Sequence, residues 1–351
     1  MLLYIHIPFC DSKCHYCSFN SYVDLFHLRQ QYMQALLVQL DYELARFSPQ
    51  EGSIETIFIG GGTPSTVAPE LYAPLFARLA PYMADDIEVT SEANPNSATA
   101  AWLKGMNALG VNRISFGVQS FNDEKLKKLG RAHKASDASA ALYRAKEVGF
   151  KHLSLDLIYA VEGDTKALLE HDLKEAFKLP IDHLSAYALT IEEGTPFAAT
   201  PEVAHERLAL TQWFLAKITA HFESYEISNF GNCRSKHNLG YWEYKDYIGL
   251  GSGAVGFLRD TRYYPTQNVQ AYIDNPLDIQ SEHLDEDAIK TEKIFLGLRS
   301  AIGVKAHVLS KNEYKQAELL VREKKLRLED ATFYNDDYLL SDELALFIQA
   351  Q

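Results

Sequence analysis

Short apolar runs alternate with amphipathic stretches through the first 190 residues of the chain. Leucines at 36, 37, 40 and 44 follow the spacing of one helix face, and the runs between such stretches have the composition of strands. The predicted strands are residues 2–9, 56–61, 87–94, 113–119, 152–160 and 183–190. The predicted helices are residues 25–47, 69–83, 99–109, 136–148 and 166–178.

Strands that alternate with helices in this way predict a parallel sheet with right-handed crossovers. Six such units are fewer than the eight of a closed barrel, so we expect an α/β fold built as an open, partial (β/α)6 barrel.

The pattern changes after residue 190. A long helix is expected at 202–222 and a short strand at 225–230, followed by a stretch rich in aromatic residues and glycine at 237–264. Helices and a terminal charged segment complete the chain. We therefore predict a barrel domain at 1–200 and a smaller α+β domain at 201–351, packed together because no low-complexity linker separates them.

Composition narrows the functional classes. Apolar residues make up 47% of the 351 residues, and 34 basic against 47 acidic residues give a net charge of −13. This charge disfavours a nucleic-acid partner, which requires a basic face. No stretch approaches the length of a membrane span, although contact with a membrane surface stays open. Four cysteines without a secretion signal indicate reduced thiols and a cytoplasmic location.

Three of these cysteines are clustered as C-x3-C-x2-C, at Cys10, Cys14 and Cys17, directly after the first predicted strand. Three thiolates can hold three corners of an iron–sulfur cubane and leave the fourth iron open for a small ligand. A zinc site completed by His15 or Cys233 is the main alternative, and the unequal gaps favour the cluster.

A glycine-rich turn, residues 60–65, follows the second strand. It lacks the Lys-Ser/Thr pair of a phosphate-binding loop. Closely approaching backbone carbonyls would suit the amino group of an amino-acid ligand. A simple tight turn is the alternative.

Charged and polar residues occupy the ends of later strands: Glu92, Gln119, Arg131 and Asp156. Such groups are costly in buried parallel strands unless they are paired or bind a ligand. Glu92 and Asp156 could accept ribose hydroxyls, and Arg131 could hold a carboxylate. For any single one of these residues, an internal ion pair is the alternative. Four such residues on successive strand–helix units favour a ligand-binding site.

Several motifs together carry a resemblance to a known family. They are the segment from Tyr4 to Cys17, residues 60–65, Gly117 to Phe121 and Asp156 to Tyr159. In this combination the chain resembles the radical S-adenosylmethionine (SAM) superfamily, in the branch that contains anaerobic coproporphyrinogen III oxidase and the HemW haem chaperones.

The resemblance implies that Cys10, Cys14 and Cys17 bind a [4Fe–4S] cluster whose open iron is chelated by SAM. It also implies a set of SAM contacts: Tyr4, Gly61, Gly62, Thr63, Glu92, Gln119, Arg131 and Asp156. An electron supplied by a donor such as flavodoxin or ferredoxin would then split the sulfonium and yield a 5′-deoxyadenosyl radical.

Three features favour the chaperone over the oxidase. The oxidase family is expected to have the pattern C-x3-C-x2-C-x-C, and in this sequence Phe19 stands at the position of the last cysteine. The oxidases also carry an N-terminal extension, whereas this sequence starts at the first strand. The third feature is a match to the H-N-x-x-Y-W motif associated with haem binding, at His237, Asn238, Tyr241 and Trp242. A histidine can ligate iron, and aromatic rings can stack on a macrocycle. Ordinary core aromatics are the alternative.

The sequence departs from the family pattern at two places. A turn that usually reads Gly-Leu-Pro-Gly is Ala160-Val-Glu-Gly-Asp164, and Val255 stands where a histidine is usual. The string from Gly251 to Gly256 matches G-x-G-x-x-G, but a strand-like segment follows it, so we reject dinucleotide binding. Cys233 has no assigned role and is expected to be a buried free thiol.

We therefore predict a haem chaperone that binds haem and transfers it to an acceptor protein. Oxygen-independent coproporphyrinogen III oxidation and an electron-transfer or structural iron–sulfur protein are the alternatives, so whether the protein is an enzyme stays open.

Overall fold

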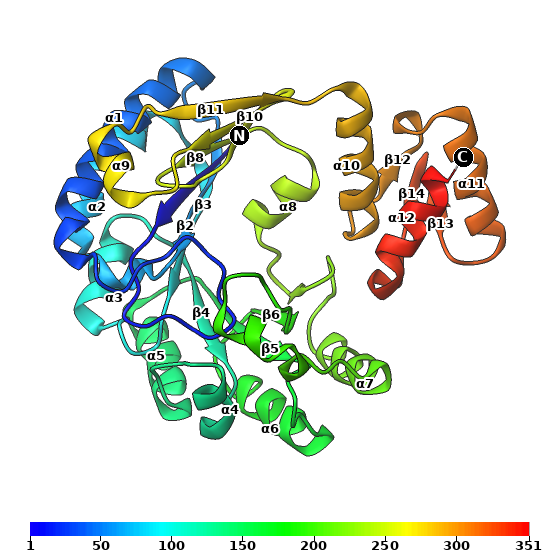
Figure 1. Ribbon diagram of the computed structural model, residues 1–351, viewed down its shortest axis with the longest axis horizontal. Helices are drawn as coiled ribbons and strands as arrows, with labels where there is room; N and C mark the ends of the chain where they lie inside the picture. The colour runs from blue at the N-terminus through cyan, green and yellow to red at the C-terminus, as the bar shows by residue number, and fades with distance from the viewer. Residues whose placement is uncertain (351) are drawn as a thin grey trace.

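The computed structural model describes residues 1–350, and a curved sheet of 11 strands forms its centre (Figure 1). The strand order is β11-β10-β9-β8-β1-β2-β3-β4-β5-β6-β7. Strands β1 to β6 are parallel to one another: β1 Leu2–Ile7, β2 Ile54–Gly61, β3 Met83–Ala93, β4 Arg113–Gln119, β5 His152–Tyr159 and β6 His183–Ala188. The six predicted strands and the partial α/β barrel are confirmed.

Helices cover the outer face of the curved sheet (Figure 1). They are α1 Arg29–Phe47, α2 Pro69–Leu79, α3 Ala100–Ala108, α4 Asp123–Lys128, α5 Ala135–Val148 and α6 Lys166–Ala176. Ile5 of β1 and Ile57 of β2 belong to one buried core with Leu36 and Leu40 of α1. Because side chains alternate along a strand, the intervening residues, such as Tyr4, face the inside of the barrel.

The chain after β6 extends the same sheet at both edges. Strand β7 Asn229–Gly231 pairs antiparallel with β6, and β8 Tyr247–Leu250 pairs parallel with β1. An antiparallel meander follows, formed by β9 Gly256–Leu258, β10 Thr261–Pro265 and β11 Ile279–His283. Residues 251–255 thus join two strands rather than a strand and a helix, which confirms the rejection of a dinucleotide fold.

Helices α7 Leu208–Thr219, α8 Lys236–Trp242, α9 Val269–Asp274 and α10 Glu286–Leu298 belong to this part. Helix α7 starts later than the predicted 202–222 because a 3-10 turn at Pro201–Val203 and an extended Arg207 precede it. The predicted strand at 225–230 is displaced to 229–231.

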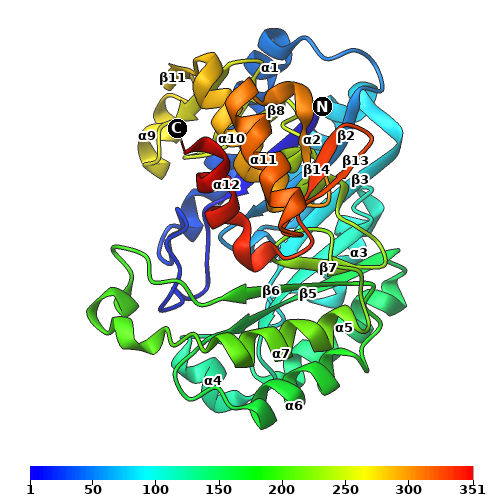
Figure 2. The same cartoon turned by 90° about the vertical axis from the view of Figure 1, so that its right-hand side faces the viewer.

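A second hydrophobic core begins in α10 and includes Leu298, Leu320, Phe333 and Ile348. Its other elements are α11 Lys311–Arg322, α12 Ser341–Gln349 and a three-stranded sheet of β12 Val304–Lys305, β13 Arg327–Glu329 and β14 Thr332–Tyr334. Figure 2 shows this unit facing the viewer, coloured orange to red. The domain boundary at residue 200 stays a prediction. Within residues 1–350, no helix has the length and apolarity needed to cross a bilayer.

Candidate functional site

A cavity of about 400 Å³ lies inside the barrel at the carboxyl ends of β1 to β6. This is the end at which barrel enzymes place their active sites. We call it the upper cavity, and its wall includes Cys10, Cys14 and Cys17 from the loop after β1.

The three cysteines are free thiols on one side of the upper cavity. Cys10 Sγ accepts a hydrogen bond from Thr63 Oγ1 at 3.4 Å, and Cys14 Sγ accepts one from Arg131 Nη1 at 3.2 Å. Within residues 1–350, the one trio of His, Cys, Asp or Glu donors that lies within 4.8 Å of one another does not include these thiols. A single zinc ion holds its sulfur ligands about 3.8 Å apart. At least one pair of these three sulfur atoms is therefore more than 4.8 Å apart, too far for one zinc ion to bind all three as they stand.

The glycine turn after β2 forms the next part of the wall. Its N–H groups are already used: Gly62 donates to Ile7 O and Thr63 to Phe9 O, both at 2.7 Å, while Gly61 donates to Glu92 Oε2 at 3.1 Å. A Cβ on Gly62 would lie 2.8 Å from two backbone oxygens, so only glycine fits there. The turn can thus offer carbonyl oxygens to a ligand, and not an anion-binding set of N–H groups.

Arg131 reaches into the upper cavity from the loop after α4. Its Nη2 donates to Asn94 Oδ1 at 2.7 Å and to Gly117 O at 2.6 Å, and its buried Nε has no partner. The guanidinium is therefore held in place at the cavity wall, and a ligand carboxylate would share or replace one of the present partners of its Nη atoms.

Two carboxyl groups line the same cavity. Burial, with the nearby Asp156 charge, raises the pKa of Glu92 to about 8, and burial raises the pKa of Asp156. Their hydrogen-bond partners are neutral: Glu92 accepts from Gly61 N, and Asp156 accepts from Ser115 Oγ at 3.3 Å and lies beside Ser185. Lone pairs left without partners suit these groups to ligand hydroxyls, such as those of a ribose.

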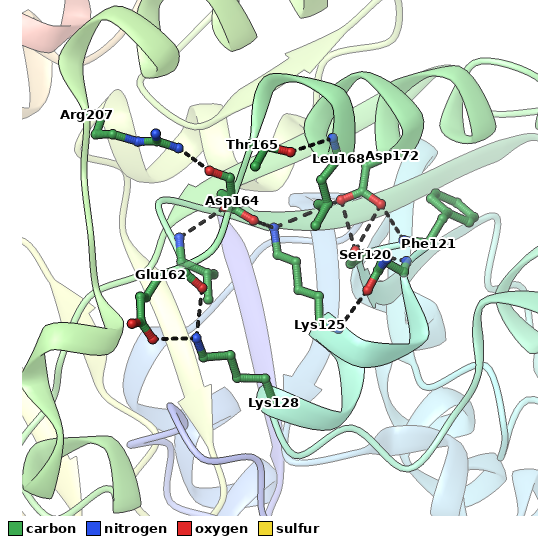
Figure 3. A network of polar contacts seen from close by, with 12 residues as sticks. Ser120, Phe121, Lys125, Lys128, Glu162, Asp164, Thr165, Leu168, Asp172 and Arg207 are labelled. Carbon is green, nitrogen blue, oxygen red and sulfur yellow. Dashed lines mark hydrogen bonds and ion pairs between the residues drawn. The ribbon is translucent and has the colours of Figure 1, made fainter.

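A buried ion network supports the loops behind this wall (Figure 3). Lys125 Nζ lies 2.7 Å from Asp164 Oδ1 and 4.0 Å from Asp172 Oδ2. Asp172 accepts hydrogen bonds from Ser120 Oγ at 2.9 Å and from Phe121 N at 2.6 Å. These two donors directly follow Gln119 in the chain. Asp164 accepts a hydrogen bond at 3.0 Å from the N–H of Val161, the residue that directly follows Ala160.

Gln119 is the last residue of β4, and Ala160 directly follows β5. Both have left-handed backbone angles, with φ of 67° and 61°. Such angles are unfavourable for residues other than glycine and persist only where the surroundings enforce them. The three-residue ion network thus stabilises two strained strand ends at the wall of the upper cavity.

A second cavity, of about 490 Å³, lies inside the barrel behind α8; we call it the aromatic cavity. Rings from four different segments line it: Tyr4, Phe58, Tyr241, Tyr244, Tyr247 and Phe257. Val255, the departure noted in the sequence, is also part of its wall. Phe58 lies beside Glu92 of the upper cavity, because an added Cβ on Gly60 would approach both side chains within 3.0 Å.

His237 is fully enclosed at the edge of the aromatic cavity, with 1% of its surface exposed. Its Nδ1 lies 2.7 Å from Thr56 Oγ1, its Nε2 lies 3.0 Å from Tyr241 Oη, and its ring stacks on Phe58 at 5.0 Å. Burial lowers the pKa of His237 to about 3, so the ring is neutral. To ligate an iron, His237 would have to give up one of these two hydrogen bonds.

Most of the predicted site residues converge on these two cavities. The upper cavity contains the three cysteines and Gly61, Gly62, Thr63, Glu92, Gln119, Arg131 and Asp156, and the aromatic cavity contains Tyr4, His237, Asn238 and Tyr241. Tyr4 lines the aromatic cavity, and its Oη lies 3.0 Å from Nδ1 of His6, whose ring adjoins Gly61 of the upper cavity. Its contact with SAM stays a prediction. Trp242 lines neither cavity.

Sequence reasoning missed several wall residues. Asn94, which holds Arg131, follows β3 directly and had the same signal as the other strand-end residues. Thr56 and Phe58 alternate with core residues on β2, so strand periodicity could have placed them inside the barrel. Tyr244 and Tyr247 gave no comparable signal.

Comparison with known proteins bears on both cavities. Residues 4–176 match the radical SAM superfamily. The heme chaperone HemW of Bacillus subtilis (strain 168) is 37% identical over 319 residues, which cover 86% of this chain and 84% of that protein. The chain belongs to the HemW family. The HemW of Escherichia coli K12 is 40% identical over 267 residues, 72% of this chain and 69% of that one.

The chain is also similar to a mitochondrial protein and to a solved enzyme structure. A mouse protein, radical S-adenosyl methionine domain-containing protein 1, mitochondrial, is 36% identical over 72% of this chain and 60% of its own length. The solved structure of coproporphyrinogen III oxidase (HemN) from Escherichia coli matches 99% of this chain and 90% of its own, with a TM-score of 0.81 and 20% identity. That likeness confirms the fold.

As a radical SAM protein, the chain takes a [4Fe–4S] cluster and SAM, and the donors in the upper cavity fit both groups. The wall contains three thiols, a glycine turn with carbonyl oxygens and the guanidinium of Arg131, which are donors of the kinds that these two groups take.

Proposed function

We propose that this protein binds haem in the aromatic cavity and delivers it to a haem-accepting protein, while its upper cavity holds the cluster and SAM. The observation that carries this proposal is the aromatic cavity itself, because the H-N-x-x-Y-W residues His237, Asn238 and Tyr241 all lie in its wall. Its HemW relatives are heme chaperones by name.

The chemistry of the aromatic cavity suits a flat, largely apolar macrocycle with carboxylate substituents. Aromatic rings provide stacking surfaces. Two cations lie in its wall, Lys245 and Arg262, and both are partly exposed. Arg262 is paired with Glu292 at 2.6 Å and Lys245 with Glu55 at 2.7 Å, so haem propionates would replace or share these carboxylate partners.

His237 contributes to the cavity as a neutral hydrogen-bonding residue that fixes the ring of Tyr241. Thr56 holds one ring nitrogen and Tyr241 occupies the other. Val255, where a histidine is usual, adds an apolar surface and no second imidazole.

In the proposed haem carrier, the upper cavity binds the cluster and SAM. When bound and reduced, the cluster can supply the electron that cleaves the SAM sulfonium. The chain's own residues bind and orient SAM: Arg131 holds the carboxylate, the glycine turn the amine, and Glu92 and Asp156 the ribose hydroxyls. An electron donor such as flavodoxin or ferredoxin, and a cytoplasmic location that keeps the thiols reduced, belong to this proposal.

The second candidate is oxygen-independent coproporphyrinogen III oxidation, which the overall likeness to the Escherichia coli oxidase favours. Phe19 argues against it, because this residue stands at the position where the oxidase pattern has a fourth cysteine. Phe19 is also 62% exposed. A phenyl ring there supplies no ligand.

A haem titration of cluster-loaded protein, followed by the Soret band, tests the carrier. We expect one haem per chain, and Tyr241→Ala and His237→Ala to weaken binding at least tenfold. Trp242→Phe is the matched control from the same motif, because Trp242 lies outside both cavities. Equal affinity in all three variants would refute haem binding at this site. Catalytic formation of protoporphyrinogen from coproporphyrinogen III, with SAM and a reductant, would establish the oxidase instead.

A further inference from the structure

A second cluster of metal-binding side chains lies at the opposite end of the barrel. His152 is the first residue of β5, Asp182 directly precedes β6, and Cys233 follows β7. Because β7 is antiparallel to β6, all three lie at the amino ends of the parallel strands, away from the upper cavity. One nitrogen, one oxygen and one sulfur donor lie within 4.8 Å of one another.

The geometry of this trio is ordered. Asp182 Oδ2 lies 2.6 Å from His152 Nδ1, and its other oxygen accepts a hydrogen bond from Leu153 N at 3.1 Å. The carboxylate thus fixes the imidazole so that Nε2 faces Cys233 Sγ, at 3.8 Å. A carboxylate behind a histidine is the usual support for a metal-ligating imidazole.

The separation between nitrogen and sulfur also fits a metal. With zinc–sulfur and zinc–nitrogen bonds of about 2.3 and 2.0–2.1 Å, tetrahedral ligands lie about 3.6 Å apart. The observed 3.8 Å requires almost no movement. All three side chains are partly exposed, so an ion and its water ligands can enter.

The charges around the trio are mixed. Arg113 lies opposite His152 in the register of β4 and β5, and its charge acts on Cys233 together with those of Asp182 and Glu88. The two nearest cations in the sequence are already paired, Arg234 with Glu223 and Lys236 with Asp86.

We propose that His152 Nε2 and Cys233 Sγ bind a zinc-type divalent cation, with Asp182 orienting the imidazole and water completing the coordination. Nitrogen and thiolate donors together select zinc over calcium or magnesium. Cys233, expected from the sequence to be a buried thiol, is thus a partly exposed ligand at a site separate from the iron–sulfur cluster.

The test is a Zn²⁺ titration of cluster-loaded protein against a chromophoric zinc chelator. We expect one equivalent of zinc in the wild type and its loss in Cys233→Ser and His152→Gln. Asp182→Asn should weaken zinc binding by about 10–100-fold, as for other residues that orient a metal ligand. Zinc bound equally by the wild type and Cys233→Ser, or no zinc bound by the wild type, would overturn the proposal.

A second measurement keeps the test independent of how well the variants fold. In the wild type, Zn²⁺ should slow alkylation of Cys233 by iodoacetamide at least tenfold, as read by mass spectrometry of the peptide that contains it. Mg²⁺ at the same concentration is the control. Unchanged alkylation in the presence of Zn²⁺ would refute the site, and neither experiment depends on haem binding.

Discussion

The upper cavity and the aromatic cavity share the inside of one barrel but are built in opposite ways. The upper cavity takes polar and charged residues from the ends of successive parallel strands, held by hydrogen bonds and a buried ion network. The aromatic cavity takes rings from β1, β2, α8 and the meander, with neutral His237 at its edge. The first is organised by electrostatics that bind a polar cofactor, and the second by apolar contact that suits a carried macrocycle.

The largest expected effect separates the two cavities. Cys14→Ala removes one of three thiolates in the upper cavity, so we expect complete loss of the cluster absorbance and of bound iron after anaerobic reconstitution. The haem affinity of the aromatic cavity should change less than threefold, because Cys14 is not part of its wall. Cys233→Ser is the matched control and should keep the cluster. Haem affinity that falls together with the cluster would show that the cavities depend on each other.

The ion network that supports the upper cavity should carry the next largest effect. Lys125→Met leaves the buried carboxylates of Asp164 and Asp172 without their cation, which should lower the free energy of unfolding by about 3–5 kcal/mol. SAM affinity should fall as well, because the strand ends at Gln119 and Ala160 lose their support.

Lys128→Met is the control on the same helix. Its partner Glu162 is exposed, so the change should cost less than about 1 kcal/mol. Urea unfolding of both variants and a SAM titration by calorimetry provide the measurements. Equal stability of the two variants would show that the buried network does not support the fold.

The two cavities should also respond to pH in opposite directions. Glu92 has a pKa of about 8 in the folded protein, above its ordinary 4.5, so its contribution to stability is present in acid and is lost as pH rises from about 4.5 to 8. His237 has a pKa of about 3, below its ordinary 6.5, so its contribution is present above about 6.5 and is lost as pH falls toward 3. Each effect is on the order of 5 kcal/mol.

Urea unfolding at several pH values, without cluster or ligands, tests this contrast. Glu92→Gln should flatten the loss of stability between pH 5 and 8 and leave the acid side unchanged. His237→Gln should do the reverse. The same residual slope in both variants would mean that other groups dominate the pH dependence.

The comparison also explains what the sequence could predict. The upper cavity follows from local order, because cysteine spacing, the glycine turn and the polar strand ends each lie next to a predictable strand. Gln119 and Arg131 could therefore be placed without any long-range information. The predicted strands agree with β1 to β6 to within a few residues for the same reason.

Long-range packing was less accessible. Tyr4 was expected among the SAM contacts from the family resemblance alone. Its place in the wall of the aromatic cavity had no local signal, because that cavity exists only once α8 packs behind β2. The enclosure of His237 by Thr56 and Tyr241 joins residues 181 positions apart and has no local signal. The ion network could not be predicted for the same reason, because the partners of Lys125, Asp164 and Asp172, lie 39 and 47 residues further along the chain.

The smallest expected effect concerns the departure at Ala160, where the family usually has glycine. Its φ of 61° is unfavourable for alanine and free of strain for glycine, so Ala160→Gly should raise the free energy of unfolding by about 1 kcal/mol. The control is Ala220→Gly, at a φ of −71°, which should lower it by up to about 1 kcal/mol. In the Lys125→Met background, Ala160→Gly should also recover part of the lost SAM affinity, because a glycine holds this angle without the ion network. If Ala160→Gly raises the free energy of unfolding but SAM affinity does not recover, the strain at residue 160 does not affect SAM binding.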